Sequence, residues 1–472
     1  MKSRLKMLNK VFWVFIEKAG VTILQFVSLI ILSRLLSPDD YGIYGIMMVF
    51  IAVSDMLVDS GFGGAIVYKK DINQRDINTF YIFNIAISIV LYIILFAISP
   101  FFESYYNIEG LSDYLRVLGV SIILFALSQV QNALLIKKLE FRKSALINVL
   151  STILSSLIAI YMAYFGYGVW SLIAQVIFNS MFVTASLWLT SKVKVGLDVS
   201  KQSFMYFWSF GSNLLFANIL QTVVNNISTS IIPKIGNITQ SGYFFQATRI
   251  NNIPTNIITV SIDKFSFPVL SKEKDLACLE SKARCINRAV LLFFLPLFPL
   301  LSYCSHPLID LLLGEKWLDV SCYFSILCWS GLGLLIQVLY RNIIKSIGNT
   351  RGIMYIEIIK SCLTFLSILI GACYGIDYLI ISIVLMAYAG AFIWSYYLKK
   401  QMNFSWIRQF KDIAKPALSF TIVYALLLLL PIPFDSYYRF CILPIGYIAY
   451  LIVNILVGQE EILSIFYKIM NR

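Results

Sequence analysis

Long apolar stretches alternate with short polar breaks along the whole chain. A helix that crosses a bilayer needs about 20 mostly apolar residues, and fourteen stretches reach or approach that length. They are rich in Leu, Ile and Phe and lack the alternation of a membrane β-barrel. The pattern therefore predicts an all-α integral membrane protein with about fourteen spans. The predicted spans are 11–33, 43–66, 77–99, 115–136, 144–165, 168–190, 206–232, 243–262, 289–312, 320–340, 353–374, 377–398, 416–431 and 440–457.

The composition supports a membrane protein with little room for a soluble domain. Of the 472 residues, 59% are hydrophobic and 13% are charged, whereas soluble domains carry roughly a quarter charged residues. The first stretch is too long for a signal-peptide core and lacks a small-residue cleavage site, so we expect it to remain as the first helix. The predicted outer breaks are short, which leaves no room for an external catalytic domain.

The distribution of basic residues predicts the orientation in the membrane. Thirty of the 38 Lys and Arg residues lie in the N-terminal tail, in every second break and at the C-terminus. This asymmetry follows the positive-inside rule and places both termini in the cytoplasm. The net charge of +13 is then explained by contact with anionic membrane lipids, as in KKLEFRK at 137–143, rather than by nucleic acid.

The order of the spans suggests two lobes. Residues 1–191 would form an N-terminal lobe, residues 203–400 a C-terminal lobe, and residues 401–472 two appended helices with a tail. An internal echo supports a parallel repeat, since Arg34 precedes Gly42 by the same spacing as Lys234 precedes Gly242. The terminal stretch EEILSIFYKIMNR is amphipathic and is expected to lie on the membrane surface.

The chain offers little for metal or redox chemistry. It has one histidine, His306, and its eight cysteines form no CxxC pair. We therefore predict no metal site, no cofactor and no disulfide framework.

The sequence SPDDYG places Asp39 next to Asp40 in the first outer break. One interpretation is an acid pair for catalysis, but the spacing fits a helix start better. Ser37 would be the N-cap, Pro38 the first helical residue, and Asp40 the partner that completes a capping box. Asp39 would add negative charge at the positive end of the helix.

Four segments of the chain resemble one transporter family. They are RLLSPDDYGIYGIMMVFIAVSDMLVDSGFGGAIVYKKD, GYGVWSLIAQ, GYFFQATRINNIPTNIITVSIDKFSFPVLS and LLGEKW. Together they resemble the polysaccharide-transport branch of the multidrug/oligosaccharidyl-lipid/polysaccharide exporter superfamily, with O-antigen and colanic-acid repeat-unit flippases nearest in appearance. The resemblance runs in order from about residue 10 to residue 320.

The resemblance implies a flippase of the bacterial inner membrane with two six-helix lobes around a central cavity. Its substrate would be an undecaprenyl-pyrophosphate-linked oligosaccharide, moved to the periplasmic leaflet for O-antigen, capsule or exopolysaccharide synthesis. Our hypothesis for the mechanism is alternating access. A polysaccharide polymerase and a chain-length regulator would be candidate partners. No catalytic residues are expected in such a protein.

Polar side chains inside predicted spans mark the candidate site, because charge at bilayer depth is costly unless it faces water or a partner. In the span 243–262, Arg249 lies on the same face as several amides, and its guanidinium can bind phosphate through two hydrogen bonds. The span 206–232 carries amides on one face that suit sugar hydroxyls. The alternative is that these amides only join neighbouring helices. The candidates are Arg249, Gln246, Asn252, Asn256, Asn218, Gln221 and Asn225.

Three other spans carry charges with two possible roles. The cations Lys18 and Lys360, with Gln25, are candidate pyrophosphate or glycan ligands. The carboxylates are candidate carriers of a coupling proton or sodium ion. The alternative is structural ion pairing, of Glu357 with Lys360 and of Glu17 or Asp55 with Lys18. The candidate carboxylates are Glu17, Asp55, Asp59 and Glu357.

Two other functions remain open from the residues alone. An integral-membrane polymerase or glycosyltransferase would need carboxylates placed as acid and base, for which SPDDYG and the acidic loop 103–113 are the only candidates. A multidrug or small-cation exporter of the same superfamily would favour an aromatic and acidic cavity.

Overall fold

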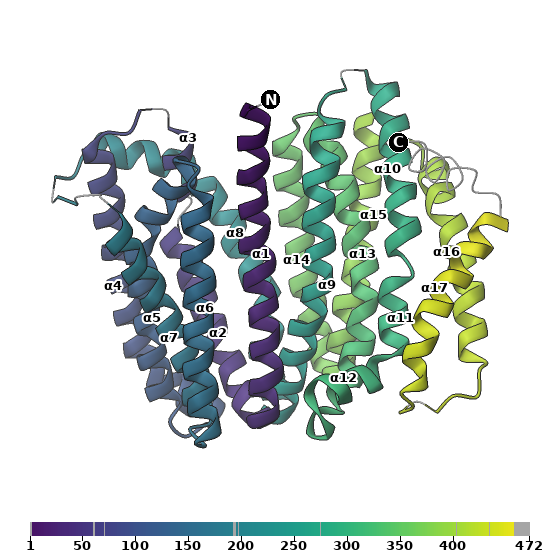
Figure 1. The fold of residues 1–472 in the computed structure, drawn as a ribbon, viewed down its shortest axis with the longest axis horizontal. Coiled ribbons are helices and arrows are strands. Elements are labelled where there is room, and N and C mark those ends of the chain that lie inside the picture. Colours follow the sequence, from purple (N-terminus) through teal and green to yellow (C-terminus); the bar gives the residue numbers. More distant parts are fainter. Residues whose placement is uncertain are drawn as a thin grey trace. The chain divides into compact units, whose positions relative to one another are not determined.

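Every secondary-structure element in the described part of the computed structural model is a helix (Figure 1). The structure describes residues 2–59, 62–69, 71–191, 195–196, 198–273, 275–402, 404–433 and 435–456. The all-α prediction is confirmed. The amphipathic stretch expected at 460–472 lies outside the described residues.

The chain divides into two compact units, residues 1–242 and 243–472. The first unit contains eight complete helices among its described residues (Figure 1), and α9 begins just before the division. Its helices are α1 (Lys2–Leu35), α2 (Pro38–Asp59), α3 (Phe62–Tyr68), α4 (Gln74–Tyr106), α5 (Leu111–Lys137), α6 (Phe141–Tyr164), α7 (Val169–Thr190) and α8 (Lys201–Ile235).

The second unit contains the remaining helices. They are α9 (Ile238–Leu270), α10 (Leu276–Phe294), α11 (Leu297–Tyr303), α12 (Ser305–Leu313), the short 3-10 helix η1 (Glu315–Trp317), α13 (Val320–Ser346), α14 (Thr350–Tyr374), α15 (Ile376–Met402), α16 (Trp406–Leu428) and α17 (Tyr438–Leu456). The lobe boundary predicted between 191 and 203 separates two repeats of six helices, which is a different division from that into compact units. It stays a prediction. In the structure, α8 packs against α2, α3 and α4 of the first unit.

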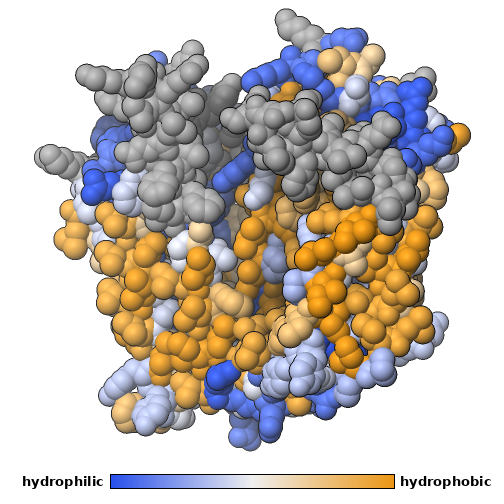
Figure 2. All heavy atoms as spheres, turned by 45° about the vertical axis from the view of Figure 1, so that its right-hand side comes forward, coloured by the Kyte–Doolittle hydropathy of each residue, from blue (hydrophilic) through white to orange (hydrophobic). Residues whose placement is uncertain are grey.

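Ten segments of the described chain are long and apolar enough to cross a membrane. The helices α8, α9 and α16 have 35, 33 and 23 residues but fall outside that group, and α17 contains a shorter apolar helix. On the face drawn in Figure 2, hydrophobic residues form a band with hydrophilic residues at both ends. The protein is a multi-pass membrane protein, and α8 and α9 carry more polar residues than its other long helices.

One predicted span is interrupted in the structure. The stretch 289–312 contains the end of α10, all of α11 and most of α12. Pro296 lies at the start of α11, where its missing N–H disturbs no ladder of hydrogen bonds. Hydropathy alone does not register such a break, because the residues on both sides remain apolar.

Helices in each unit approach closely through small residues and polar contacts. In the second unit, a Cβ on Gly333 of α13 would meet the backbone of Ala387 in α15 at 2.6 Å. Beside it, the Gln337 amide donates to the Ala387 carbonyl at 2.7 Å. Such contacts drive helix association in a bilayer, where lipid and side chains are equally apolar.

The start of α2 forms the predicted capping box. The backbone N–H of Ser37 donates to Asp40 Oδ2 at 2.8 Å, and the backbone N–H of Asp40 donates to Ser37 Oγ at 3.2 Å. Asp39 Oδ1 accepts a hydrogen bond from Thr239 Oγ1 at the start of α9, at 2.5 Å. Both carboxylates therefore have structural partners.

The start of α9 repeats this arrangement 200 residues later. Asn237 and Gln240 exchange backbone-to-side-chain hydrogen bonds of 2.7 and 3.1 Å, as in a capping box. A Cβ on Gly42 would collide with the Ile238 carbonyl, and a Cβ on Gly242 would collide with the Pro38 carbonyl. The similar spacing of Gly42 and Gly242 in the sequence thus corresponds to two helix starts whose backbones pack against each other at these glycines.

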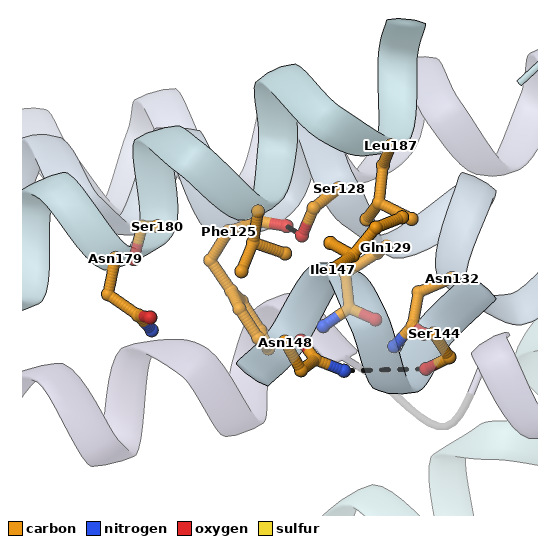
Figure 3. Close-up of a pocket in the computed structure, with 11 residues that line it drawn as sticks. Phe125, Ser128, Gln129, Asn132, Ser144, Ile147, Asn148, Asn179, Ser180 and Leu187 are labelled. Carbon is orange, nitrogen blue, oxygen red and sulfur yellow. Dashed lines mark hydrogen bonds between the residues drawn. The ribbon is translucent and has the colours of Figure 1, made fainter. Parts of the chain in front are cut away.

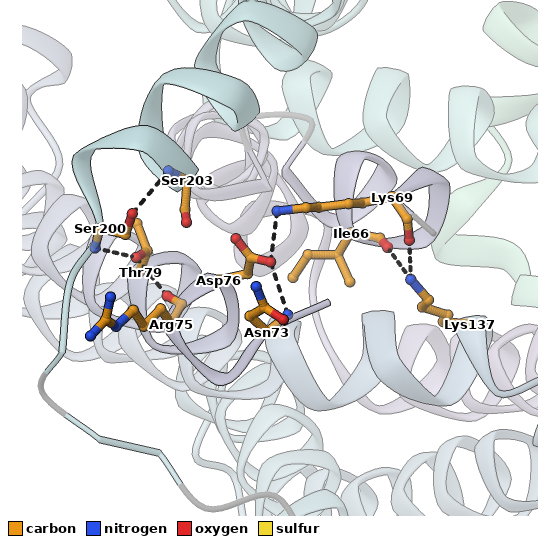
Figure 4. Close-up of polar contacts among 9 residues, drawn as sticks. All are labelled: Ile66, Lys69, Asn73, Arg75, Asp76, Thr79, Lys137, Ser200 and Ser203. Atoms are coloured by element: carbon orange, nitrogen blue, oxygen red, sulfur yellow. Dashed lines mark hydrogen bonds and ion pairs between the residues drawn. The ribbon is translucent and has the colours of Figure 1, made fainter. Parts of the chain in front are cut away.

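Polar residues at the start of α4 form hydrogen bonds with the segment that precedes α8 (Figure 4). Asp76 pairs with Lys69 Nζ at 2.7 Å. The Ser200 N–H donates to Thr79 Oγ1, and the Gly196 N–H donates to Asn78 Oδ1, both at 2.9 Å. These contacts explain why α8 joins the first unit although it follows a polar linker.

Candidate functional site

The polar face of α9 is divided between buried and accessible positions. Gln246 is fully buried, with 0% exposure, whereas Arg249 is half-buried and Asn252 and Asn256 are exposed. In the described part of the chain, the Arg249 guanidinium forms no ion pair or hydrogen bond. An accessible arginine at bilayer depth requires water or an anionic ligand, so Arg249 keeps the donors that a phosphate would need.

The predicted polar face of α8 is accessible over two turns. Gln221 and Asn225 are exposed, Asn218 is half-buried, and the face ends at Thr229, which is 7% exposed. Accessible amides on a helix this polar are expected to contact water or a polar ligand rather than lipid. The assignment of these residues to substrate binding stays a prediction.

On α1, Glu17 and Lys18 do not pair with each other. Glu17 accepts hydrogen bonds from Ser144 Oγ at 2.9 Å and from Asn148 Nδ2 at 2.7 Å, both on α6. Lys18 and Gln25 are exposed, and Lys18 forms no ion pair with the described residues. The structure therefore does not support the alternative pairing of Glu17 with Lys18.

Asp55 and Asp59 lie one turn apart near the end of α2, and both are half-buried. Asp55 Oδ1 is buried without a hydrogen-bond partner among the described residues. No ion pair with Lys18 forms there either. Their role in ion coupling stays a prediction.

In the second unit, Glu357 and Lys360 of α14 form the ion pair that their spacing predicts. Lys360 Nζ lies 2.5 Å from Glu357 Oε2, and it also donates to Gln337 Oε1 of α13 at 3.2 Å. The side chains of the pair are 19% and 21% exposed. Since Lys360 is already engaged, the structural interpretation describes this pair better than an open phosphate site.

We predict that Lys360→Met lowers the apparent melting temperature of the purified protein, because Glu357 is left as an unpaired charge. A loss of roughly 2 kcal/mol is expected, below the 3–5 kcal/mol of a fully buried pair, since water reaches both groups. The double variant Glu357→Gln/Lys360→Met should recover most of the loss. If the double variant melts lower than Lys360→Met, the pair is not the stabilising unit inferred here.

A polar cavity of about 200 Å³ lies in the first unit between α5, α6 and α7 (Figure 3). Most of its lining side chains carry an amide or a hydroxyl, and none is charged. The lining residues are Phe125, Ser128, Gln129, Asn132, Ser144, Ile147, Asn148, Asn179, Ser180, Val183 and Leu187.

Several amides around this cavity lack a protein partner. Gln129, 8% exposed, and Asn132 form no hydrogen bond with the described residues, and Asn179 Oδ1 is buried without a partner. A buried polar group without a partner costs about 1–3 kcal/mol. The buried Asn179 Oδ1 therefore requires water or a polar ligand in the cavity.

The cavity residues are not conspicuous in the sequence, because each span contributes only a few scattered amides and hydroxyls. A signal was available: Gln129 and Asn132 lie shortly before the turn at 138–140, and Ser144 and Asn148 lie shortly after it. Two antiparallel helices joined by a short turn bring such positions to the same depth.

The turn that joins α5 and α6 near this cavity is charged. Glu140 and Lys143 form an ion pair of 2.5 Å, and the hydrogen bond from Lys143 lowers the pKa of the Glu140 carboxyl. The turn therefore stays polar at neutral pH, as expected for a segment at the membrane surface.

Sequence comparison identifies the family. A family model described as "Polysaccharide biosynthesis protein" matches residues 31–322. The chain belongs to this family. The match begins before the capping box of α2 and extends into α13, so it includes the polar faces of α8 and α9 as well as the cavity residues.

Curated relatives of this chain have names related to the family description. The succinoglycan biosynthesis transport protein ExoT of Rhizobium meliloti is 23% identical over 68% of this chain and 64% of its own length. The lipopolysaccharide biosynthesis protein WzxC of Escherichia coli is 24% identical over 75% and 70%. The teichuronic acid biosynthesis protein TuaB of Bacillus subtilis is 24% identical over 68% and 67%. The chain thus spans about two thirds of the length of each.

Solved structures support the fold. The lipid II flippase MurJ, in an inward closed conformation, superposes with a TM-score of 0.76 at 17% identity, covering 98% of this chain and 100% of that one. An inward-facing multidrug resistance MATE family transporter of the MOP superfamily gives a TM-score of 0.61 at 16% identity, covering 81% and 94%. The chain therefore shares the fold of these two structures.

Proposed function

We propose that this protein is a flippase that moves a polyprenyl-pyrophosphate-linked oligosaccharide across the bacterial inner membrane by alternating access. Its family and the names of its relatives support a role in polysaccharide biosynthesis. The observation that carries the proposal is the accessible polar face of α9, on which Arg249 has no ion-pair partner among the described residues. A pyrophosphate supplies the oxygen acceptors that this guanidinium lacks.

In this proposal, the headgroup enters from the cytoplasmic side and its pyrophosphate binds Arg249. Lys18 is exposed and forms no ion pair in the described part of the chain, so it is the second candidate. Lys360 is a weaker candidate because Glu357 and Gln337 engage it. The amides Asn252, Asn256, Gln221 and Asn225 would bind glycan hydroxyls, while the polyprenyl tail stays in lipid.

The proposal contains no covalent step. In SPDDYG, Asp40 caps α2 and Asp39 accepts from Thr239, so neither carboxylate needs a catalytic role to explain its position. A small-cation exporter would favour acidic and aromatic groups around its site, whereas the accessible faces of α8 and α9 present amides and an arginine. Both termini are proposed to be cytoplasmic, on the evidence of the charge distribution.

We expect Arg249→Ala to lower export at least about tenfold, because a hydrogen-bonded charge contributes about 1.5–3 kcal/mol. The variant would be expressed in a flippase-null strain, with surface polysaccharide and the lipid-linked repeat unit in the cytoplasmic leaflet both measured. Surface polysaccharide should fall while the lipid-linked unit accumulates.

Two variants control this experiment. Arg249→Lys keeps the charge but loses the planar fork, so it should show intermediate export. Arg351→Ala removes an exposed arginine at the start of α14 and should export normally at equal expression. Normal export by Arg249→Ala would refute the role of Arg249, and export of a cationic drug without any glycan phenotype would favour the exporter alternative.

A further inference from the structure

We infer that the cavity between α5, α6 and α7 is a subsite for a single neutral sugar ring of the transported glycan. This inference rests on the proposed function and goes beyond it, because it assigns recognition of one sugar to the first unit. Arg249, the proposed phosphate ligand, belongs to a different unit and does not line this cavity.

The chemistry of the lining favours a neutral polyhydroxylated ligand. Amides and hydroxyls both donate and accept hydrogen bonds, as sugar hydroxyls do. No cation lines the cavity, so a phosphate or a uronate would have no counter-charge there. Phe125 adds an aromatic surface that can cover the apolar face of a sugar ring.

The amides are available to a ligand rather than used by the protein. Gln129 and Asn132 form no hydrogen bond with described residues, and Asn179 Oδ1 is buried and without a partner. Figure 3 shows Gln129, Asn132 and Asn179 at separate points around the cavity. A ligand with several hydroxyls in a ring can reach such dispersed groups, whereas a single ion cannot.

Glu17 positions one further amide. It lies outside the lining and accepts from Asn148 Nδ2 at 2.7 Å, while Asn148 Nδ2 also donates to Ser144 Oγ at 3.3 Å. With its donor group engaged in this way, Asn148 presents its Oδ1 as an acceptor for a sugar hydroxyl. Glu17 is therefore a positioning residue and does not itself contact the sugar.

The size and depth of the cavity fit one ring. A volume of about 200 Å³ corresponds to roughly six or seven water molecules at ~30 Å³ each, which excludes a whole oligosaccharide. The cavity lies toward the turn between α5 and α6. The charge pattern places this turn on the cytoplasmic side, where the repeat unit is loaded under the proposed function.

The test measures binding of free monosaccharides to the full-length protein in lipid nanodiscs by saturation-transfer NMR. Glucose, galactose and N-acetylglucosamine are the neutral probes, and glucuronate is the charged comparator. At least one neutral sugar should bind saturably and more tightly than glucuronate. Asn179→Leu replaces an unpaired amide by an apolar side chain of similar size, and it should weaken that binding by about three- to tenfold.

Gln175→Leu is the matched control, one helical turn from Asn179 on α7. Gln175 donates to Ser28 Oγ at 2.8 Å and to Ser156 Oγ at 3.2 Å, so it serves the fold. Gln175→Leu should lower the melting temperature and retain sugar binding by the folded protein. Asn179→Leu should show the opposite, a preserved melting temperature with weakened binding.

Three results would overturn the subsite: no saturable binding of any neutral sugar, equal binding of glucuronate, or unchanged affinity in Asn179→Leu. Arg249→Ala separates this inference from the proposed function, because it should bind the free sugar like the wild type while failing to export. Normal export by Arg249→Ala, together with sugar binding that depends on Asn179, would refute the phosphate role and leave the subsite standing.

Discussion

Replacing Asp412 by alanine is expected to cost about 2–3 kcal/mol of stability and to lower the apparent melting temperature by several degrees. Asp412 on α16 is 3% exposed and receives hydrogen bonds from two arginines of α10. Arg284 binds it through two nitrogens, at 2.9 and 3.0 Å, and Arg288 Nε lies 2.6 Å from Asp412 Oδ1. Removing the carboxylate leaves two cations side by side on one helix.

The expected cost lies below the 3–5 kcal/mol typical of a broken buried pair. The side chains of Arg284 and Arg288 are 26% and 31% exposed, so water can solvate part of each released charge. Asp412→Asn should fall between the wild type and Asp412→Ala, because the amide oxygen still accepts a hydrogen bond.

The measurement is thermal unfolding of the purified protein in detergent, followed by intrinsic fluorescence. Asp435→Ala is the matched control, since Asp435 is exposed and has no partner among the described residues; it should melt like the wild type. Replacing Asp412, Arg284 and Arg288 together by apolar residues should recover much of the loss. A wild-type melting temperature for Asp412→Ala would show that this cluster does not hold α16 to α10.

The second large effect is expected from Gly242→Ala. A methyl group at this position collides with the Pro38 carbonyl, and neither backbone can move without separating the starts of α2 and α9. Overpacking costs typically 1–3 kcal/mol, and a clash with backbone belongs near the upper end. Gly42→Ala should have a similar effect, because its Cβ would collide with the Ile238 carbonyl.

Two measurements check this prediction. The melting temperature should fall in Gly242→Ala, and cross-linking between Asp39→Cys and Thr239→Cys should become less efficient, since those side chains are joined by a 2.5 Å hydrogen bond. Gly20→Ala is the control: a Cβ there would meet only Val149 Cγ2 at 3.4 Å, and helix propensity then favours alanine by up to about 1 kcal/mol. Unchanged melting and cross-linking in Gly242→Ala would contradict the close approach.

Many residues of the candidate site could be proposed from the sequence, because polar residues stand out inside apolar stretches. Arg249, Asn252 and Asn256 were predicted from spacing on one face, and the structure leaves all three at least partly accessible. Gln246 follows the same spacing but is fully buried. Spacing gives the angular position of a residue on its own helix, whereas burial depends on which neighbour covers that angle.

The ion pair on α14 could also be predicted from the sequence. Glu357 and Lys360 lie one turn apart on a single helix, so their ion pair required only local geometry. The cluster around Asp412 joins residues more than a hundred positions apart, and no local spacing indicates it. The break between α10 and α11 within the stretch 289–312 was missed because apolar composition continues across it.

The sequence by itself determined that this is an all-α membrane protein, where most of its spans lie, and how α2 is capped, because span length and capping are local properties. Only the tertiary structure decided the contact of Gly42 with α9, the engagement of Asp412 by α10, and the cavity around Gln129 and Asn179. In a bilayer, most helix faces are apolar whether they meet lipid or protein. Hydrophobic pattern therefore marks the helices but does not determine which faces pack together.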